Sequence, residues 1–210
     1  MASKDPEYLY GINDQLKEMR GIIEEVAIQI DHGLSDKKLD LEPRLTELCK
    51  EAEIKEEQTV ELCTEALIRY QPFASDLRAI TVAIKVAYDL TRICRYLRNI
   101  SDVQEDFDIQ FQDPLLLELF RKAKGMVSRS LDAYFASDAR AAKAIINDDE
   151  EIDEGYRAIA RKYAASTTAP GECILFNGIT ARIIERLADQ ACYICHETIY
   201  LVTARRSYFR

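Results

Sequence analysis

Residues 70–78 read YQPFASDLR, and this short stretch decides how the rest of the chain is interpreted. Pro72 cannot continue a helix, because its ring removes a backbone donor and clashes with the preceding turn. Ser75 or Ala74 is placed to cap a helix that begins directly afterwards. Asp76 puts negative charge into the first turn of that helix, where the helix dipole favours it. The stretch therefore predicts a tight turn between two long helices.

The other prolines divide the sequence in the same way. The five prolines are separated by long stretches in which apolar residues recur at steps of three and four, a pattern typical of helices with one buried face. We expect an all-α fold of six long helices: residues 7–33, about 40–70, about 75–103, 114–135, about 138–165 and 171–203. Polar residues 101–113 are expected to link the third helix to the fourth, and Asp40 to open the second.

Composition excludes several classes of protein. The chain has 210 residues and a net charge of −9, which disfavours a nucleic-acid-binding scaffold. Hydrophobic residues make up 48% of it, enough for a folded core, and the scarcity of Gly (7) and Pro (5) argues against a sandwich or barrel. Lys85 and Glu197 interrupt the most apolar stretches, so we expect no membrane span. No apolar segment follows Met1–Pro6, so we expect no signal peptide and a cytoplasmic protein whose six cysteines are reduced.

The two halves of the chain resemble each other at small anchors. Ser35-Asp36 and Ser137-Asp138 lie 102 positions apart, Ile54 and Ile152 lie 98 apart, and the triplets that begin at Arg92 and Arg186 lie 94 apart. A smoothly shrinking offset is expected when two connections differ slightly in length. We interpret the chain as a tandem repeat of a three-helix unit, residues 1–103 and 104–210, with the two units packed side by side as one compact unit.

The run at residues 70–78, together with its continuation to Asp89-Leu90, resembles the PhoU family of phosphate-uptake regulators. Residues 184–189 (IERLAD) resemble the second-half signature of that family, and the acidic residues 148–154 add support. The resemblance implies two tandem three-helix bundles and a non-enzymatic adaptor that regulates phosphate uptake and phosphate-responsive signalling. It also implies homodimers and partners such as the ATPase of a phosphate ABC transporter or a sensor histidine kinase.

Members of this family carry paired acidic residues four positions apart in each half, and several bind iron or other metals. In the second half the pairs are Asp149 with Asp153 and Glu185 with Asp189. Residues four apart share one helix face, and carboxylates converging from two helices suit hard or borderline cations. We therefore expect a site for iron or another divalent or trivalent cation in the second repeat only, with no organic cofactor. His196 points in nearly the same direction as Glu185.

The first half departs from this pattern. Subtracting 94 and 98 from the four positions gives Thr91, Arg95, Glu51 and Lys55, so three carboxylates are replaced. Two of the replacements are cations, which repel a metal. We expect the first-half site to be empty and closed by ion pairs among Glu51, Lys55, Arg95 and nearby acids.

Other interpretations stay open. The same four acids could serve a carboxylate-bridged metalloenzyme with two cations, although neither His32 nor His196 forms the Glu-x-x-His pair typical of such enzymes. The chain could instead be a PhoU-like adaptor of another transport system. Residues 192–196 (CYICH) fit a haem-attachment pattern, which their mid-helix position disfavours. A cluster of arginines could hold phosphate: Arg69, Arg78, Arg92, Arg95 and Arg98.

Overall fold

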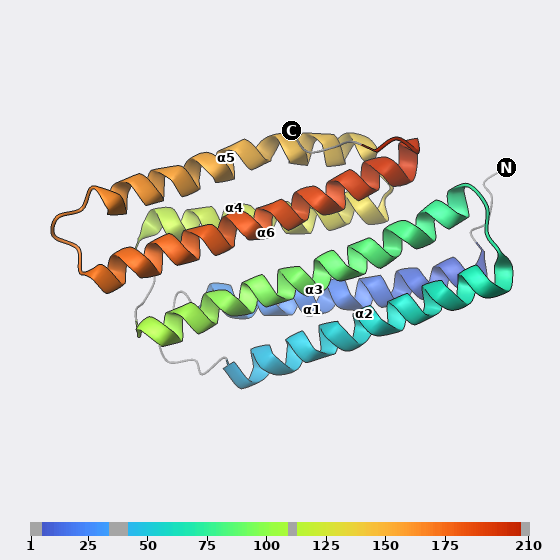
Figure 1. Cartoon of the computed structure of the whole chain (residues 1–210), viewed down its shortest axis with the longest axis horizontal. Helices are drawn as coiled ribbons and strands as arrows, with labels where there is room; N and C mark the ends of the chain where they lie inside the picture. Colours follow the sequence, from blue (N-terminus) through green and yellow to red (C-terminus); the bar gives the residue numbers. More distant parts are fainter. Residues whose placement is uncertain (1–5, 34–41, 109–112, 207–210) are drawn as a thin grey trace.

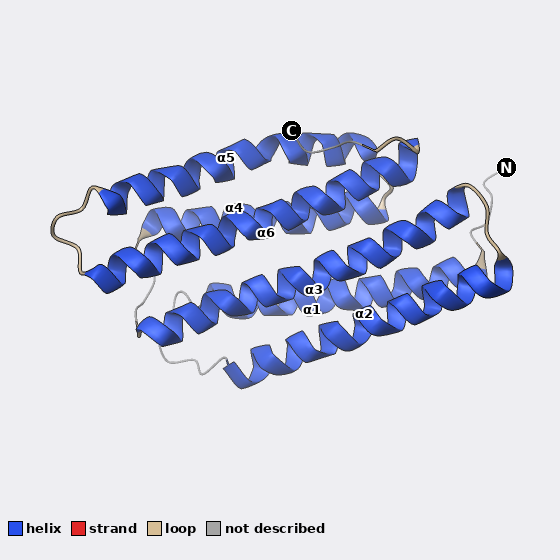
Figure 2. Cartoon of the chain, in the orientation of Figure 1, coloured by secondary structure: helices blue, strands red, loops and turns tan. Residues whose placement is uncertain are grey.

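The computed structural model describes residues 6–33, 42–108 and 113–206, and these residues form six helices and no β-strand (Figure 1 and Figure 2). The helices are α1 (Glu7–Gly33), α2 (Glu42–Tyr70), α3 (Ser75–Phe107), α4 (Pro114–Phe135), α5 (Ala139–Ala164) and α6 (Gly171–Thr203). The expected all-α fold is confirmed. Among the described residues, none of the helices is long and apolar enough to cross a membrane.

Helix α3 is longer than the sequence predicts. Residues 101–107, expected to form part of a polar linker, continue the helix, which ends where Asp108 adopts φ 47°. This stretch has one apolar face: Ser101 is buried, Val103 packs on the core, and the ring of Phe107 lies 6.4 Å from that of Phe176. The contact with α6 therefore outweighs the polar composition of the segment. The expected boundary between repeats, at residues 103 and 104, falls within the helix.

Side chains cap two of the helices. Asp113 accepts a hydrogen bond from the backbone N–H of Leu115 at the start of α4, and Asp138 accepts two from the first turn of α5. Helix α3 begins without such a bond: Ala74 is its N-cap at φ 47°, and the hydroxyl of Ser75 donates to Asp76 instead. The predicted turn is present, but the backbone conformation forms it rather than a side-chain cap. Ser35, Asp36 and Asp40 lie outside the described residues.

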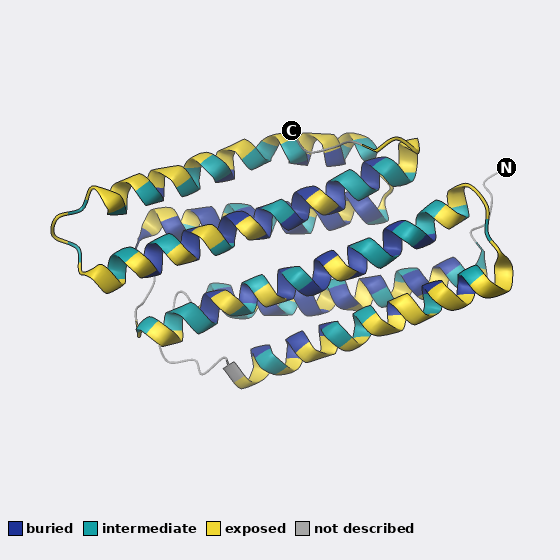
Figure 3. Ribbon diagram, in the orientation of Figure 1, coloured by how far each residue is buried: buried dark blue, intermediate teal, exposed yellow. Residues whose placement is uncertain are grey.

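The helices form two three-helix bundles that lie side by side, α1 to α3 and α4 to α6 (Figure 1). The main contact between the bundles is the packing of α3 against α6, which run antiparallel. Arg78 donates to the carbonyl oxygen of Leu201 at 2.8 Å, and Lys85 pairs with Glu197 at 2.6 Å. Within the described segments, α2 contacts only α1 and α3, and α5 contacts only α4 and α6. The outward faces of these two helices carry many of the exposed residues (Figure 3).

Each of the outer helices α2 and α5 buries a row of residues along one face, here called its seam, and the two seams correct the alignment of the repeats. Buried residues recur every seven positions in both helices: Leu45, Ala52 and Thr59 in α2, and Ile145, Ile152 and Ile159 in α5. The two seams superpose when the repeats are offset by 100 residues. The expected offset of 98 instead matches Ile152, which is 1% exposed, with Ile54, which is 53% exposed. For α3 and α6 the offset of 94 holds, since it superposes the buried faces of both helices. The anchor at Ile54 was therefore wrong by two positions.

A pair of glycines tests how tightly the helices pack. A Cβ atom added to Gly155 of α5 would lie 2.5 Å from Cδ1 of Leu119, a buried residue of α4, whereas one added to Gly125 of α4 would meet no atom within 4 Å. Gly125→Ala is expected to stabilise the fold by roughly 0.5–1 kcal/mol through helix propensity. Gly155→Ala gains the same propensity but must displace Leu119, so it is expected to be the less stable variant by about 1 kcal/mol or more. Urea denaturation of both variants measures the difference, and equal stabilisation would contradict the close approach of α4 and α5.

Candidate functional site

The four predicted acids lie together where α5 and α6 pack. Asp149 and Asp153 are half-buried on α5, Glu185 is buried on α6, and Asp189 is half-buried one turn further along. Burial raises the pKa of Asp149 to about 6, and the negative charges of Asp189 and Asp153 add to this effect. Burial also raises the pKa of Glu185 and of Asp189, with further contributions from neighbouring acids. The structure thus gathers the four carboxyl groups on one face.

Arginines from the same two helices neutralise most of this cluster. Arg182 donates to Glu185 at 2.5 Å, Arg157 pairs with Asp153 at 2.8 Å, and Arg186 lies 3.7 Å from Asp189. The thiol of Cys192 donates a hydrogen bond to the carboxyl group of Asp149, which opposes the rise in the pKa of Asp149. The ring of Tyr156 lies beneath the guanidinium of Arg182. The arginines are the residues that sequence reasoning missed, although their spacing of three and four from the acids was visible.

The donor chemistry suits a cation, but arginines already pair with three of the four acids. Oε2 of Glu185 is buried without a hydrogen bond, 4.0 Å from Nε of Arg186, so it has a lone pair to offer. However, the described part of the chain contains no group of three or more His, Cys, Asp or Glu side chains placed to hold a metal ion. Arg157, Arg182 and Arg186 would compete with a cation for Asp153, Glu185 and Asp189. His196 is half-buried seven residues beyond Asp189 on the same helix, and burial lowers its pKa.

The corrected offset changes the first-repeat equivalents of Asp149 and Asp153. They are Cys49 and Glu53 rather than Glu51 and Lys55, whereas Thr91 and Arg95 still match Glu185 and Asp189. Arg95 pairs with Glu53 at 2.9 Å, and Lys55 pairs with Glu18 of α1. Both predicted cations therefore form ion pairs, but with other acids than the exposed Glu51. Three of the four acids remain substituted.

A second group of charges lies between α3 and α6. Asp89 is 8% exposed, and burial raises its pKa to about 7, with a further rise from the negative charge of Glu197. Lys85 and Arg92 oppose this rise. The sequence shows Lys85 and Glu197 only as interruptions of apolar stretches. A charge of each sign in two otherwise apolar helices is the signal that could have identified them as a pair.

The arginines considered as a phosphate pocket point to separate partners. Arg78 donates to the carbonyl of Leu201, Arg95 pairs with Glu53, and Arg69 pairs with Glu65 on its own helix. Arg92 donates to the hydroxyl of Tyr96 and stacks on Tyr88 and Tyr96. The structure therefore does not form the pocket that the cluster suggested. In the haem-like stretch, Cys192 and Cys195 are buried free thiols in the middle of α6.

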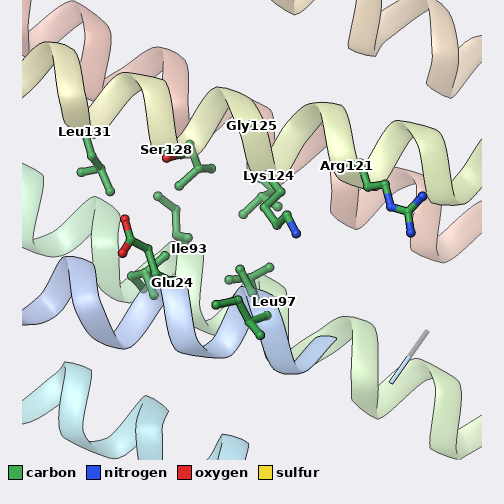
Figure 4. Close-up of a pocket in the computed structure, with 13 residues that line it drawn as sticks. Glu24, Ile93, Leu97, Arg121, Lys124, Gly125, Ser128 and Leu131 are labelled. Carbon is green, nitrogen blue, oxygen red and sulfur yellow. The ribbon is translucent and has the colours of Figure 1, made fainter. Parts of the chain in front are cut away.

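A cavity of about 280 Å³ lies between α1, α3 and α4 (Figure 4). Arg121 lies toward one end of it and Leu131 toward the other, with Lys124 between them. Both cations pair with Asp31, so their positive charges face an acid of the same chain. The remaining walls are largely aliphatic: Ile23, Ala27, Ile93, Leu97, Val127 and Leu187. None of the four predicted acids lines this cavity, which is thus separate from the candidate site.

The raised pKa of Asp149 predicts a pH-dependent stability. The folded state holds this proton more tightly than the unfolded state, where the pKa is near 3.8, so ionisation destabilises the fold. This loss of folding stability is absent below about pH 4 and complete above about pH 6. Asp149→Asn, which keeps an acceptor for Cys192, is expected to add roughly 1 kcal/mol of stability near pH 7, after solvent screening is allowed for, and nothing near pH 4.

Urea denaturation at both pH values measures this effect. Glu154→Gln, an exposed substitution on the same helix, is the matched control and should leave the pH profile unchanged. Equal effects of Asp149→Asn at the two pH values would show that Asp149 does not titrate differently in the folded and unfolded states.

Comparisons with known proteins agree with this architecture. A family model described as the PhoU domain matches residues 16–103 and again residues 116–198. The phosphate-specific transport system accessory protein PhoU of Escherichia coli (strain K12) is 29% identical over 202 residues, covering 92% of this chain and 83% of that protein. The protein of the same name from Serratia marcescens is 30% identical over 203 residues, covering 92% and 82%.

A solved structure has the same fold. The crystal structure of the phosphate transport system regulatory protein PhoU from Streptococcus pneumoniae superposes with a TM-score of 0.86 at 19% identity, covering 96% of this chain and 98% of that one. Because the family model accounts for one three-helix bundle after the other, the chain belongs to the PhoU family.

Proposed function

We propose that this protein is a regulator of phosphate transport that acts by binding proteins and has no catalytic activity of its own. The observation that carries the proposal is the double match of the PhoU domain along a chain whose relatives are named accessory proteins of a phosphate-specific transport system. The proposed partners are the ATPase of a phosphate ABC transporter and a sensor histidine kinase. The protein would work in the cytoplasm as a homodimer.

The turn between α2 and α3 is the proposed contact with the ATPase. Four apolar side chains are exposed around it: Ile68 (72%), Tyr70 (56%), Phe73 (83%) and Leu77 (42%). Exposed apolar side chains gathered in one place favour a protein contact, and aromatic residues contribute most to binding at such surfaces. Tyr70 stacks on Tyr8 with ring centroids 4.7 Å apart, which leaves Phe73 as the protruding anchor. Positive φ angles at Gln71 and Ala74 fix the shape of the turn.

Phe73→Ala tests this contact without disturbing the core. We expect the variant to bind the purified ATPase subunit at least about tenfold more weakly, as measured by calorimetry, because a protruding aromatic anchor is lost. Leu115→Ala is the matched control, since Leu115 is 47% exposed at the start of α4, and it should bind as the unchanged protein does. Unchanged affinity of Phe73→Ala would exclude the turn as the contact.

An adaptor for another transport system is the alternative to be separated. The tagged protein recovered from phosphate-rich and phosphate-starved cells should carry the phosphate transporter ATPase, identified by mass spectrometry. Recovery of an unrelated transporter in both states would favour the alternative. Light scattering of the purified protein tests the homodimer, and a phosphatase assay tests the absence of catalysis.

The cation site of the second repeat is a separate proposal that depends on the arginines. Asp149, Asp153, Glu185 and Asp189 supply hard oxygen donors, and the bare Oε2 of Glu185 supports a role in binding. Because Arg182 and Arg186 compete with a cation for two of these acids, the double variant Arg182→Gln, Arg186→Gln is expected to bind manganese or iron more tightly than the unchanged chain. Calorimetry with each metal measures this, and weaker binding by the double variant would contradict competition.

A further inference from the structure

Two buried thiols meet between the outer and central helices of the first repeat. Sγ of Cys49 on α2 lies 2.8 Å from Sγ of Cys94 on α3, and the two residues are 4% and 0% exposed. The thiol of Cys49 also donates a hydrogen bond to the carbonyl oxygen of Cys94 at 3.5 Å, so it is held against the backbone that carries its partner. Cys49 occupies the position that corresponds to Asp149 in the second repeat. The first repeat thus has a thiol, paired with a second thiol, at the position where the second repeat has Asp149.

We propose that Cys49 and Cys94 are an oxidisable dithiol, which a hydroperoxide converts to a disulfide and a thiol reductant restores. The thiolate of Cys49 attacks one peroxide oxygen, the O–O bond breaks, and the leaving oxygen takes a proton to become water or an alcohol. This leaves a sulfenic acid on Cys49. The sulfur of Cys94 then attacks the sulfenic sulfur, the S–O bond breaks, and the oxygen leaves as water with the thiol proton of Cys94. Two thiols lose two electrons, and one peroxide gains them.

Electrostatics favours Cys49 as the attacking thiol. The hydrogen bond between the two sulfurs, in which either atom can donate, lowers the pKa of Cys49 and raises that of Cys94. Burial opposes the lowering at Cys49, and the positive charge of Arg98 adds to it. The thiolate is the reactive form of cysteine, so the reaction should begin at Cys49.

The fold permits the cross-link and gives the oxidant a route. The two sulfurs need to approach by only about 0.8 Å to reach a disulfide bond length. Within the described residues, α2 packs only on α1 and α3, so a local opening of α2 exposes both thiols while α3 and α6 stay packed. The resulting bond joins an outer helix to the central helix of its bundle.

The other cysteines lack such a partner geometry. Cys63, also buried on α2, has a carbonyl as its polar neighbour, the oxygen of Ile80 at 3.9 Å, and burial raises its pKa to about 12. Cys192 and Cys195 are both buried on α6, and burial raises the pKa of each thiol. Cys173 is half-buried near the start of α6 and accepts a hydrogen bond from the side-chain amide of Asn177 rather than facing a second thiol. A disulfide formed in the folded protein should therefore join Cys49 to Cys94.

The test treats the folded full-length protein with hydrogen peroxide, blocks the remaining thiols with an alkylating agent, and maps cross-linked peptides by mass spectrometry. We expect the intact mass, measured before alkylation, to fall by two hydrogens and the cross-link to join Cys49 to Cys94. The thermal unfolding midpoint should rise by about 5 °C or more, because the bond constrains the unfolded chain. Dithiothreitol should reverse both changes.

Variants make the assignment specific. Cys49→Ala and Cys94→Ala should each abolish the cross-link and the thermal shift, whereas Cys63→Ala, a buried substitution on the same helix, should retain both. The proposal fails if the unchanged protein gains oxygen without a cross-link, if the bond joins any other pair, or if no thiol of the folded protein is oxidised. These outcomes leave the proposed role in phosphate transport untouched, because that role does not depend on the thiols.

Discussion

Helices α3 and α6, each 33 residues long, pack antiparallel through the centre of the molecule, and each is also the inner member of its own three-helix bundle. Their apolar faces supply much of the core, and removing this surface from water is the main favourable term in folding. Apolar packing alone only weakly determines how far one helix is shifted along the other. The pair of Lys85 and Glu197 and the bond from Arg78 to the carbonyl of Leu201 add directional contacts that fix it. The positions of the outer helices follow from this central contact.

Much of the fold could be predicted from local rules, because those rules act at particular positions of the sequence whatever the rest of the chain does. Pro72 must stop a helix wherever the chain runs, and Asp113 and Asp138 cap helices through hydrogen bonds to their own neighbours. Two features were not readable. Residues 101–107 look polar, yet Phe107 packs on Phe176 from the other repeat, a contact that no local pattern contains. The register of α2 was misjudged because Ile54 is apolar but faces solvent, which only the packed seam reveals.

The candidate site was predicted in part for the same reason. Acids spaced by four on one helix share a face, so the pairing of Asp149 with Asp153 and of Glu185 with Asp189 followed from the helix period. The meeting of the two pairs depends on how α5 packs against α6. Which cations meet them depends on side-chain rotamers, and the ion pairs of Arg157, Arg182 and Arg186 needed coordinates. The first-repeat equivalents depended on the register, so the thiol of Cys49 emerged only after the seams of α2 and α5 were superposed.

Over the described part of the chain the two outer helices do not touch, although each carries half of the distinctive chemistry of its repeat. Cys49 of α2 lies against the thiol of Cys94, and Asp149 of α5 belongs to an acidic cluster balanced by arginines. Any influence of one place on the other must therefore pass through the contact of α3 with α6 or through the smaller contact of α1 with α4. The repeated three-helix frame thus carries different side-chain chemistry at equivalent positions, a thiol at Cys49 in the first repeat and a carboxyl group at Asp149 in the second.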